Sequence, residues 1–528
     1  MRTALLRSCA RFLARRRVLF IVLAYSVAFL VVGLSGFAPA QEEANAQSPT
    51  TDKPNIVFVL TDDLDYASTQ KMPQLTSLLA DQGTSFEQAF VSHPICCPSR
   101  ATFLTGLYDH NHGVKGNAPP EGGFQTFVSE GHEENSIAVG LQEAGYQTAF
   151  FGKYLNQYPA DDPTHVPPGW DEWYGKLDEQ RLYDYRINEN GEEVSYGSET
   201  RDFFTDVLSG QATDFVRRAA PEDQPFFAYV APTAPHGPAT PAERHKGAFA
   251  EEEVPSPPSY DEEDVSDKPS PINNAERISE EEASNIDDYY RQRLESMLAV
   301  DEMIGSLVEE LDAAGELENT YIFFTSDNGW FNGEHRIQST KNRPYEESAR
   351  VPLFVRGPGV SAGTKMEKLA LNTDLAPAFA DLAGASFPAD GRTLVPLLGG
   401  EEPASWRSSV LLEKLPQEGG GEEGNGKGKA KGKGKAKGKG KEGETGAGGV
   451  PKSGPGQSPH FQAVRTGTHK YVEYDNGERE LYDLAADPYE MESIHETADP
   501  ALLEDLKAKL EALKSCSEEG CREAEDAP

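Results

Sequence analysis

The sequence predicts an α/β protein with a large mixed, mainly parallel sheet between layers of helices and a smaller antiparallel sheet near the C-terminus. From Pro54 to about Leu398, short apolar runs alternate with segments of helical periodicity, a pattern typical of parallel sheets covered on both faces. Residues 461–484 have the pattern of short antiparallel strands, with a turn at 475–477. The chain has 528 residues, enough for two domains and a large core.

The first 50 residues have the features of an export segment. Residues 18–37 form an uninterrupted apolar run behind a basic stretch, and small residues follow at 38–40 and 44–46. The run has about the length that spans a bilayer, so cleavage as a signal peptide and retention as a membrane anchor both stay open. In either case we expect the rest of the chain outside the cytoplasm, secreted or anchored, since the Arg-rich stretch stays inside.

The charge balance is strongly acidic. Asp and Glu number 87 against 49 Lys and Arg, which gives a net charge of -38. Such a surface repels nucleic acid and anionic lipid over a Debye length. We therefore expect no nucleic-acid partner.

Four apolar segments of the larger region end in polar side chains. In open parallel sheets, ligands bind just beyond the carboxyl ends of the strands, so these side chains can converge on one site. The polar residues are Asp62 and Asp63 after 55–61, Lys153 after 147–151, His236 after 226–231, and Asp327 and Asn328 after 321–325.

The acidic members of this set suit a divalent cation. Three carboxylates and an amide oxygen are hard ligands, typical of Ca²⁺ or Mg²⁺ rather than zinc. Asp62 and Asp63 alone would be explained better by a turn or a helix cap. Beside the carboxylate of Asp327 they repel one another unless a cation neutralises them, and together with Asn328 they favour a metal site.

A candidate nucleophile lies at Cys96. Pro98 can open a helix at its first position, which places Cys96 at the helix N-terminus, where backbone N–H groups and the dipole favour an anion. A nucleophile there attacks an anionic ester beside stabilising dipoles. From position alone, a buried pair of Cys96 and Cys97 before a helix is the alternative.

A long helix is expected in the second half of the larger region. Residues 251–285 are rich in Glu, Asp, Ser and Pro and predict a long acidic loop. From Ile286 to Leu311 apolar residues recur every three or four positions, and Gly315 is a natural stop.

The C-terminal part contains a low-complexity insertion. In residues 419–449, lysines between 427 and 441 alternate with Gly or Ala. Such a stretch buries almost nothing and is expected to be mobile. Two interpretations of this stretch stay open: a solvated surface insertion, and a cationic tether for an acidic polymer. A final helix is expected near 501–514.

The cysteines are few for an exported chain. Cys516 and Cys521 are close together in a polar tail, where a local disulfide can form in an oxidising compartment. Cys96 and Cys97 are adjacent, which strains a disulfide, so a structural or chemical role must explain them.

Residues 96–106 carry Cys-x-Pro-x-Arg followed by Ala-Thr-x-Leu-Thr-Gly, which is the sulfatase signature. From about Pro54 to Glu490 the chain resembles type I sulfatases of the alkaline phosphatase superfamily. The supporting matches occur in order: LTDD at 60–63, GKYLN at 152–156, APH at 234–236, TSDNG at 325–329, Lys341, VPLFVRGPG at 351–359 and ELYDLAADPYE at 480–490. The CCPSR, GKYLN and HVPPGWDEWY segments look most similar to N-acetylglucosamine-6-sulfatases and the related heparan 6-O-endosulfatases.

This resemblance implies an alkaline phosphatase-like fold and a modified nucleophile. A formylglycine-generating enzyme would oxidise Cys96 to formylglycine, whose hydrated gem-diol attacks the sulfate ester, whereas Cys97 would stay a structural thiol. One Ca²⁺, with Mg²⁺ as the alternative, would be held by Asp62, Asp63, Asp327, Asn328 and the modified Cys96.

The resemblance also implies catalytic roles for basic residues. Arg100 would orient the gem-diol and Lys153 would neutralise sulfate oxygens, while His236 and Lys341 would stabilise or protonate the leaving oxygen. Asp327 would take the proton from the attacking hydroxyl. A sulfate monoester is already anionic, so attack needs cationic groups, and expulsion of a sugar alkoxide needs an acid.

One motif departs from the family pattern. Many sulfatases have a histidine two or three residues after the lysine of GK, where this chain has Leu155 and Asn156. The base that eliminates sulfate is therefore unassigned. His112 and His335 are candidates, with histidines outside the site as the alternative interpretation.

We therefore expect three parts: a signal peptide or anchor with a linker at 1–50, a sulfatase catalytic domain at 51–398, and a C-terminal subdomain at 399–528. The expected activity is hydrolysis of sulfated carbohydrates, preferably 6-O-sulfated N-acetylglucosamine or related glycosaminoglycan units. An arylsulfatase or a phosphonate or phosphate ester hydrolase is the alternative, and a non-catalytic glycan-binding surface protein is a remote one. A cationic cleft within an acidic surface favours small or terminal sulfated substrates.

Overall fold

The computed structural model describes residues 53–527, apart from 401–402, 404, 418–450 and 452–453. The chain divides into two units at residues 52 and 53, and the second is described below. The predicted export segment at 18–37 and the insertion at 419–449 lie outside the described residues. In the part that the structure describes, no helix combines the length and apolarity that a membrane crossing requires.

The larger sheet has ten strands in the order β11-β2-β10-β9-β1-β8-β4-β5-β6-β7. The five strands from β9 to β5 run parallel, and the remaining pairings are antiparallel except β11 with β2. The fold class predicted from the sequence is thus confirmed. The strands are β1 (Asn55–Thr61), β2 (Thr84–Phe86), β4 (Gln147–Gly152), β5 (Glu172–Lys176), β6 (Arg186–Glu189), β7 (Glu192–Ser195), β8 (Phe226–Ala231), β9 (Thr320–Ser326), β10 (Leu353–Arg356) and β11 (Thr364–Met366).

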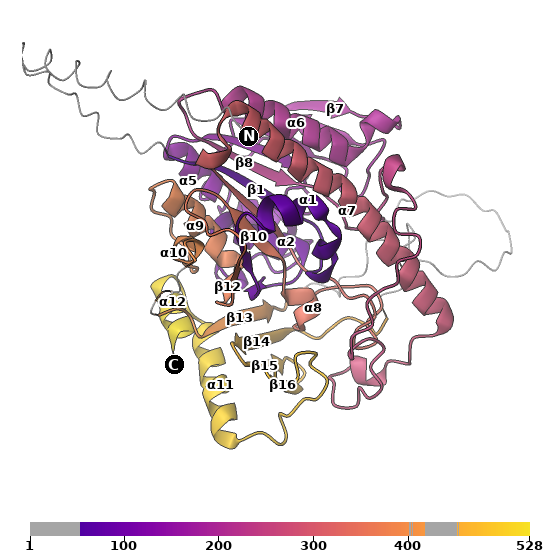
Figure 1. Cartoon of the computed structure of the whole chain (residues 1–528). Coiled ribbons are helices and arrows are strands. Elements are labelled where there is room, and N and C mark those ends of the chain that lie inside the picture. Colours follow the sequence, from indigo (N-terminus) through magenta and orange to yellow (C-terminus); the bar gives the residue numbers. More distant parts are fainter. Residues whose placement is uncertain (1–52, 401–402, 404, 418–450, 452–453, 528) are drawn as a thin grey trace, which may run out of the picture. The chain divides into compact units, whose positions relative to one another are not determined.

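Both faces of this sheet are covered by helices (Figure 1). Along β1 the side chains alternate: Phe58 and Leu60 pack on one face, and Val57 and Val59 on the other. The first face packs on α2 (Cys96–Thr105), α5 (Ile137–Glu143) and α9 (Leu375–Leu382). The second packs on α6 (Phe204–Ala219) and α7 (Glu280–Ala314). This double burial explains the nearly continuous apolar runs of the central strands.

The long helix α7 begins earlier than the apolar spacing predicted. It starts at Glu280 rather than near Ile286, because Ser279 and Glu282 form a capping box and the first turn is acidic. It ends where expected, at Gly315 with φ 79°. The N-terminal turns of α7 therefore belong to what the sequence predicted as an acidic loop.

The second sheet is antiparallel, as predicted, in the order β13-β14-β15-β16. Its strands are β13 (Ser409–Lys414), β14 (Phe461–Thr466), β15 (His469–Tyr474) and β16 (Arg479–Asp483). Helix α11 (Pro500–Leu513) follows at the expected place, and α12 (Glu519–Asp526) was not predicted. Shorter elements are α1 (Pro73–Leu75), α3 (Asp109–His112), α4 (Gly123–Ser129), α8 (Glu346–Ala349), α10 (Val395–Leu398), and the paired β3 (Ala89–Phe90) and β12 (Ala370–Leu371).

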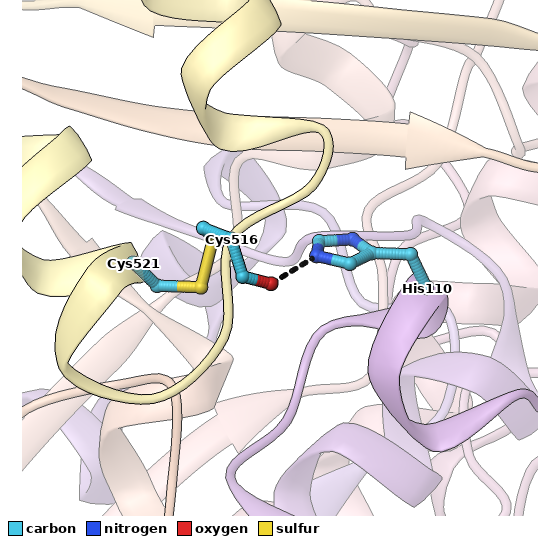
Figure 2. Close-up of side chains that lie close together, drawn as sticks. All are labelled: His110, Cys516 and Cys521. Carbon is cyan, nitrogen blue, oxygen red and sulfur yellow. Dashed lines mark hydrogen bonds between the residues drawn. A yellow bond between two sulfur atoms is a disulfide. The ribbon is translucent and has the colours of Figure 1, made fainter.

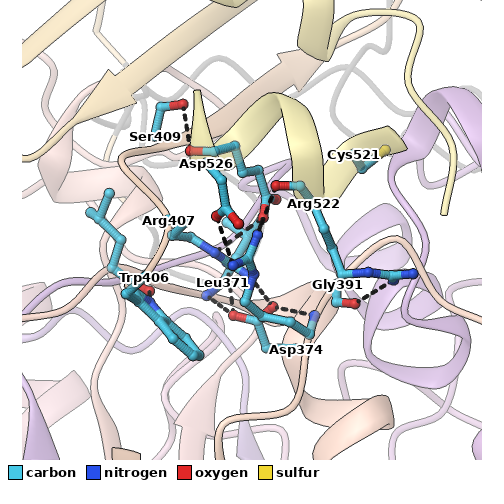
Figure 3. A network of polar contacts seen from close by, with 12 residues as sticks. Leu371, Asp374, Gly391, Trp406, Arg407, Ser409, Cys521, Arg522 and Asp526 are labelled. Atoms are coloured by element: carbon cyan, nitrogen blue, oxygen red, sulfur yellow. Dashed lines mark hydrogen bonds and ion pairs between the residues drawn. The ribbon is translucent and has the colours of Figure 1, made fainter. Parts of the chain in front are cut away.

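The C-terminal helices are fixed to the larger region by polar contacts. Cys516 and Cys521 form the local disulfide expected from the sequence, and the backbone carbonyl of Cys516 accepts a hydrogen bond from His110 of α3 (Figure 2). Arg407, just before β13, lies at the centre of a second network (Figure 3). Its guanidinium donates to Asp374 and contacts Glu525 of α12 at 3.1 Å.

Candidate active site

The polar residues predicted at the strand ends meet at one edge of the large sheet. Asp62 and Asp63 follow β1, Asp327 and Asn328 follow β9, and each is at most 1% exposed. The backbone N–H of Asp63 donates to Asp327 Oδ1 at 3.1 Å, which joins the two loops. Since β1 and β9 are parallel neighbours, their carboxyl ends are adjacent.

The acidic residues form a buried cage suited to a cation. One ligand atom each from Asp62, Asp63, Cys96 and Asp327 lies within 4.8 Å of the others. Asn328 Nδ2 donates to Asp63 Oδ1 at 2.8 Å, while its Oδ1 is buried without a hydrogen-bond partner among the described residues. Three buried carboxylates beside an unsatisfied amide oxygen fit Ca²⁺, which prefers such hard oxygen ligands.

Cys96 is the first residue of α2, with Ile95 as its N-cap. We expected Pro98 to open this helix, but Pro98 is the third residue. It fits there because the first four N–H groups of a helix have no intrahelical acceptor. Cys96 Sγ lies 3.5 Å from Asp62 Oδ1 and 2.8 Å from Lys341 Nζ. Cys97 points into the core instead, and both thiols are free.

Four basic side chains surround the cage. Arg100 Nε donates to Asp327 Oδ2 at 2.7 Å, while its Nη2 is buried without a partner among the described residues. Lys153 Nζ donates to Asp62 Oδ2 at 2.7 Å. These two cations come from α2 and from the end of β4.

The other two basic side chains approach from loops. Lys341 Nζ forms a short contact with Asp63 as well as with Cys96. His236 Nε2 lies 3.9 Å from Asp63 Oδ2, and its side chain is 26% exposed. The residues that the sequence placed in the site thus lie in this cluster, apart from the two candidate bases, His112 and His335. Lys341 follows no predicted strand, and only the family resemblance could have found it.

The charges of the cluster are mutually dependent. Burial alone would raise the pKa of Asp62 and of Asp63, but the charges of Lys153 and Lys341 hold these pKa values below the usual range. Burial and the charge of Asp62 raise the pKa of Asp327. Burial also raises the pKa of the Cys96 thiol, in spite of Lys153 and Lys341. An unmodified Cys96 is therefore protonated and a weak nucleophile at neutral pH.

A cavity of about 420 Å³ opens onto this cluster. Its lining includes amides and a carboxylate from the loops after α3, β4 and β5: Asn117, Asn156, Gln157, Glu179 and Gln180. It also includes Lys341 and Arg343, Lys414 of β13 and residues 455–458. The sequence did not indicate Lys414 and residues 455–458 as part of the site, because they lie far from the catalytic motifs along the chain.

The two candidate histidines for sulfate elimination lie among other partners. His112 Nε2 is 3.2 Å from Asp109 and 3.1 Å from Thr102 Oγ1. His335 Nδ1 lies 2.7 Å from Glu262. Neither side chain lines the cavity. The cavity histidine is His236.

Arg293 is a residue near the site that the sequence did not reveal. It lies on α7, is 1% exposed, and donates to the backbone carbonyl of Asp63 at 2.6 Å. Asp63 has φ 70°, a left-handed conformation that few non-glycine residues adopt. The signal available in the sequence was an arginine within the apolar stripe of the predicted helix.

Comparisons with known proteins agree with this geometry. Residues 54–385 match the protein family described as Sulfatase. The human N-acetylglucosamine-6-sulfatase is 34% identical over 89% of this chain and 86% of its own length. An extracellular sulfatase SULF-1 homolog of Drosophila melanogaster is 35% identical over 70% of this chain, but over only 34% of its own.

Among solved structures, one similar protein is bound to its substrate D-glucosamine-2-N,6-O-disulfate. It superposes with a TM-score of 0.69 at 25% identity, over 90% of this chain and 99% of that chain.

Proposed function

Since this chain belongs to the sulfatase family and is a sulfuric ester hydrolase, we propose that its substrate is a 6-O-sulfate on N-acetylglucosamine or a related glycosaminoglycan unit. The similarity to N-acetylglucosamine-6-sulfatases over most of the chain supports this substrate. The observation that carries the proposal is the position of Cys96, which lies between a carboxylate cage and basic side chains, next to residues that line a cavity.

We propose that Cys96 acts as formylglycine, made by a formylglycine-generating enzyme, with Cys96 Sγ marking the place of the gem-diol oxygens. The raised pKa of the unmodified thiol supports this, because the thiolate is the nucleophilic form of a cysteine. The neighbouring Cys97 packs in the core and would remain a thiol.

Asp62, Asp63, Asp327, Asn328 and the modified Cys96 would hold Ca²⁺, or Mg²⁺ in its place. The ion would supply positive charge to the nucleophile and to the sulfate oxygens. Asp327, whose pKa is raised, would take the proton from the attacking hydroxyl. Arg100 would orient the gem-diol through Nη2, since Nε donates to Asp327 and Nη1 donates to the Lys153 carbonyl.

The remaining basic residues would act on the ester. Lys153 neutralises charge that develops on the sulfate oxygens as the S–O bond forms. His236 and Lys341, which line the cavity, would stabilise the leaving sugar oxygen, and one of them would give it a proton as the S–O bond to the sugar breaks. Loss of a proton from the second hydroxyl of the gem-diol then expels sulfate and restores the aldehyde.

Extracytoplasmic action fits the predicted export segment at 18–37. The name of the Drosophila relative, an extracellular sulfatase, supports this location. We propose that the chain is secreted or anchored at the outer membrane face, where it meets sulfated carbohydrates.

The decisive experiment measures hydrolysis of four esters: sulfate release from N-acetylglucosamine-6-sulfate and from an aryl sulfate, and release of the alcohol from a phosphate and a phosphonate monoester. We expect the sugar sulfate to be turned over fastest; faster turnover of the phosphorus esters would refute the proposal. Mass spectrometry of the Cys96 peptide should show the aldehyde in protein from the native host. Cys96→Ala should abolish turnover, whereas Cys97→Ala should leave the rate within a few-fold of wild type.

A further inference from the structure

Arg343 is a buried cation without a carboxylate partner among the described residues. Its side chain is 3% exposed and lines the cavity above Cys96. Nη2 donates to two neutral acceptors, the backbone carbonyls of Pro455 at 3.1 Å and Gly456 at 2.6 Å. Nε is buried without any hydrogen-bond partner in the described part of the chain.

Other buried arginines of this chain are neutralised. Arg100 contacts Asp327 at 2.7 Å, and Arg407 contacts Glu525 at 3.1 Å. Burying a charge without a partner is costly, whereas a guanidinium that stays protonated gains most from a carboxylate or sulfate. Burial lowers the pKa of Arg343, although the negative charge of Glu480 acts in the opposite direction. The charge of Arg343 is therefore available to an anion in the cavity.

The loop that carries Arg343 is held in place. Asn342 adopts φ 68°, its N–H donates to Pro94, and its side chain is hydrogen-bonded to the buried His93 at 3.1 Å. Because of this turn, Lys341 and Arg343 line the same cavity. Lys341 reaches Cys96, and Arg343 is a second cation from the same loop that lines the cavity.

The lining of the cavity combines neutral, acidic and basic groups. Apart from Lys153, the lining residues from the loops after β4 and β5 are neutral or acidic, and Glu179 accepts a hydrogen bond from the Gln157 N–H at 2.6 Å. Such groups suit sugar hydroxyls. Other lining residues are the cations Lys341, Arg343 and Lys414, the last of which donates to the Ser458 carbonyl. Arg343 thus adds a positive charge to this cavity beyond those that contact the carboxylate cage.

We propose that Arg343 forms an anion subsite that binds a second acidic group, sulfate or carboxylate, on the substrate. This inference rests on the proposed function and extends it, because it makes a doubly anionic amino sugar a better substrate than a singly sulfated one. The second group is either an N-sulfate on the same sugar or the carboxylate of an adjoining sugar acid.

The test compares Arg343→Gln and Arg343→Lys with wild type on three substrates. These are N-acetylglucosamine-6-sulfate, glucosamine-2-N,6-O-disulfate, and a uronate-containing disaccharide with one 6-O-sulfate. Arg343→Gln should raise KM for at least one doubly anionic substrate about tenfold, the usual effect of losing a charge-assisted hydrogen bond. KM for the singly sulfated sugar and kcat should change less than about twofold, and Arg343→Lys should recover part of the difference.

Arg336→Gln is the matched control. Arg336 also donates to backbone carbonyls, those of Glu262, Glu263 and Ala275, but it does not line this cavity. It should leave the substrate preference unchanged. An equal loss on all three substrates with Arg343→Gln would mean that Arg343 only supports residues 455–456, and would overturn the proposal.

Affinity measurements distinguish a failure of this inference from a failure of the proposed function. In a Cys96→Ala background, calorimetry measures affinity for the same sugars without turnover. Arg343→Gln should weaken binding of the doubly anionic sugar about tenfold relative to the singly sulfated one. That result supports the subsite even if wild type fails to hydrolyse these sugars, which would refute the proposed function alone. An unchanged ratio of affinities overturns the subsite.

Discussion

At the scale of single residues, the site depends on compensation between buried charges. Asp62 and Lys153 are both almost fully buried, and each shifts the pKa of the other toward its charged form. Asp63 and Lys341 behave in the same way. Removing one partner leaves a buried charge unpaired, which costs more than the pair itself contributes. Substitutions at Lys153 or Lys341 are therefore expected to disturb the cage as well as the chemistry.

Arg293 provides a prediction at this scale. Its guanidinium holds the carbonyl of Asp63 and lies 4.8 Å from the ring of Trp330, which follows Asn328 closely in the second ligand loop. Arg293→Met should lower the affinity for Ca²⁺ about tenfold, as loss of a residue that orients a ligand usually does. Calorimetric titration of the metal-free protein measures this directly.

Two further variants make the Arg293 result interpretable. Arg293→Lys keeps a donor and a charge, and should recover part of the affinity. Arg291→Met alters a partly exposed arginine of the same helix, which contacts Asp288 and Glu252 instead. It should bind Ca²⁺ like wild type. Unchanged Ca²⁺ affinity in folded Arg293→Met would show that Asp63 keeps its conformation without this contact.

At the scale of elements, the strand ends determine where the site lies. The ends of β1, β4, β8 and β9 were predictable because central strands of a parallel sheet are apolar throughout, so a polar cluster marks each carboxyl end. Helix starts were harder to predict. The starts of α2 and α7 depend on N-cap geometry, which apolar periodicity does not report.

Helix α3 gives a pH-dependent prediction. Burial alone would lower the pKa of His110, but hydrogen bonding to Glu413 and the charge of that carboxylate raise it to about 9, from 6.5. Protonated His110 therefore stabilises the fold below pH 6.5, and this contribution is lost as pH rises through 9. Thermal unfolding should show Tm falling over this interval, by an amount that corresponds to about 2 kcal/mol.

Variants of the same pair check the assignment. His110→Gln and Glu413→Gln should each flatten the dependence of Tm on pH between 6.5 and 9, because neither retains the ion pair. A slope equal to that of wild type in both variants would assign the pH dependence to other groups. His110 also contacts the Cys516 carbonyl (Figure 2), so the same experiment reports on docking of the C-terminal segment.

At the scale of the whole molecule, both sheets contribute to the cavity. Lys414 ends β13, and residues 455–458 precede β14, yet they line the same cavity as Lys341. Tyr108 Oη donates to Glu525, and the network around Arg407 (Figure 3) adds further contacts between the two parts. The domain boundary predicted at 398 and 399 remains a prediction. It falls between α10 and β13.

Metal removal should affect the stability of the whole chain. The cage joins β1, α2 and β9, so a bound ion stabilises the folded protein only. Ca²⁺ at a hundred times its dissociation constant should add about 2.7 kcal/mol to the free energy of unfolding. Prolonged treatment with EDTA should lower Tm and turnover together, and Ca²⁺ should restore both. Equal Tm values with and without Ca²⁺ would contradict a Ca²⁺ site.

The lysine-rich insertion can be tested by deletion. β13 and β14, the strands on either side of residues 419–449, pair directly with each other. We expect this pairing to remain after the deletion. The sequence predicts that these residues bury almost nothing, so Tm and turnover of a monosaccharide sulfate should be unchanged. Binding to a sulfated polymer distinguishes the two interpretations: a salt-dependent loss on deletion supports a tether, and unchanged binding supports a solvated insertion.

The sequence alone determined the family, the fold class and the cage of Asp62, Asp63, Cys96 and Asp327, because these depend on short motifs and on the apolar runs before them. The tertiary structure decided which distant residues complete the site. Arg293 contacts Asp63, 230 residues away, and Arg343 contacts Pro455, 112 residues away. Such contacts depend on side-chain packing between elements, which no local pattern records. For the same reason, a chain of net charge -38 can present a cavity lined by several cations.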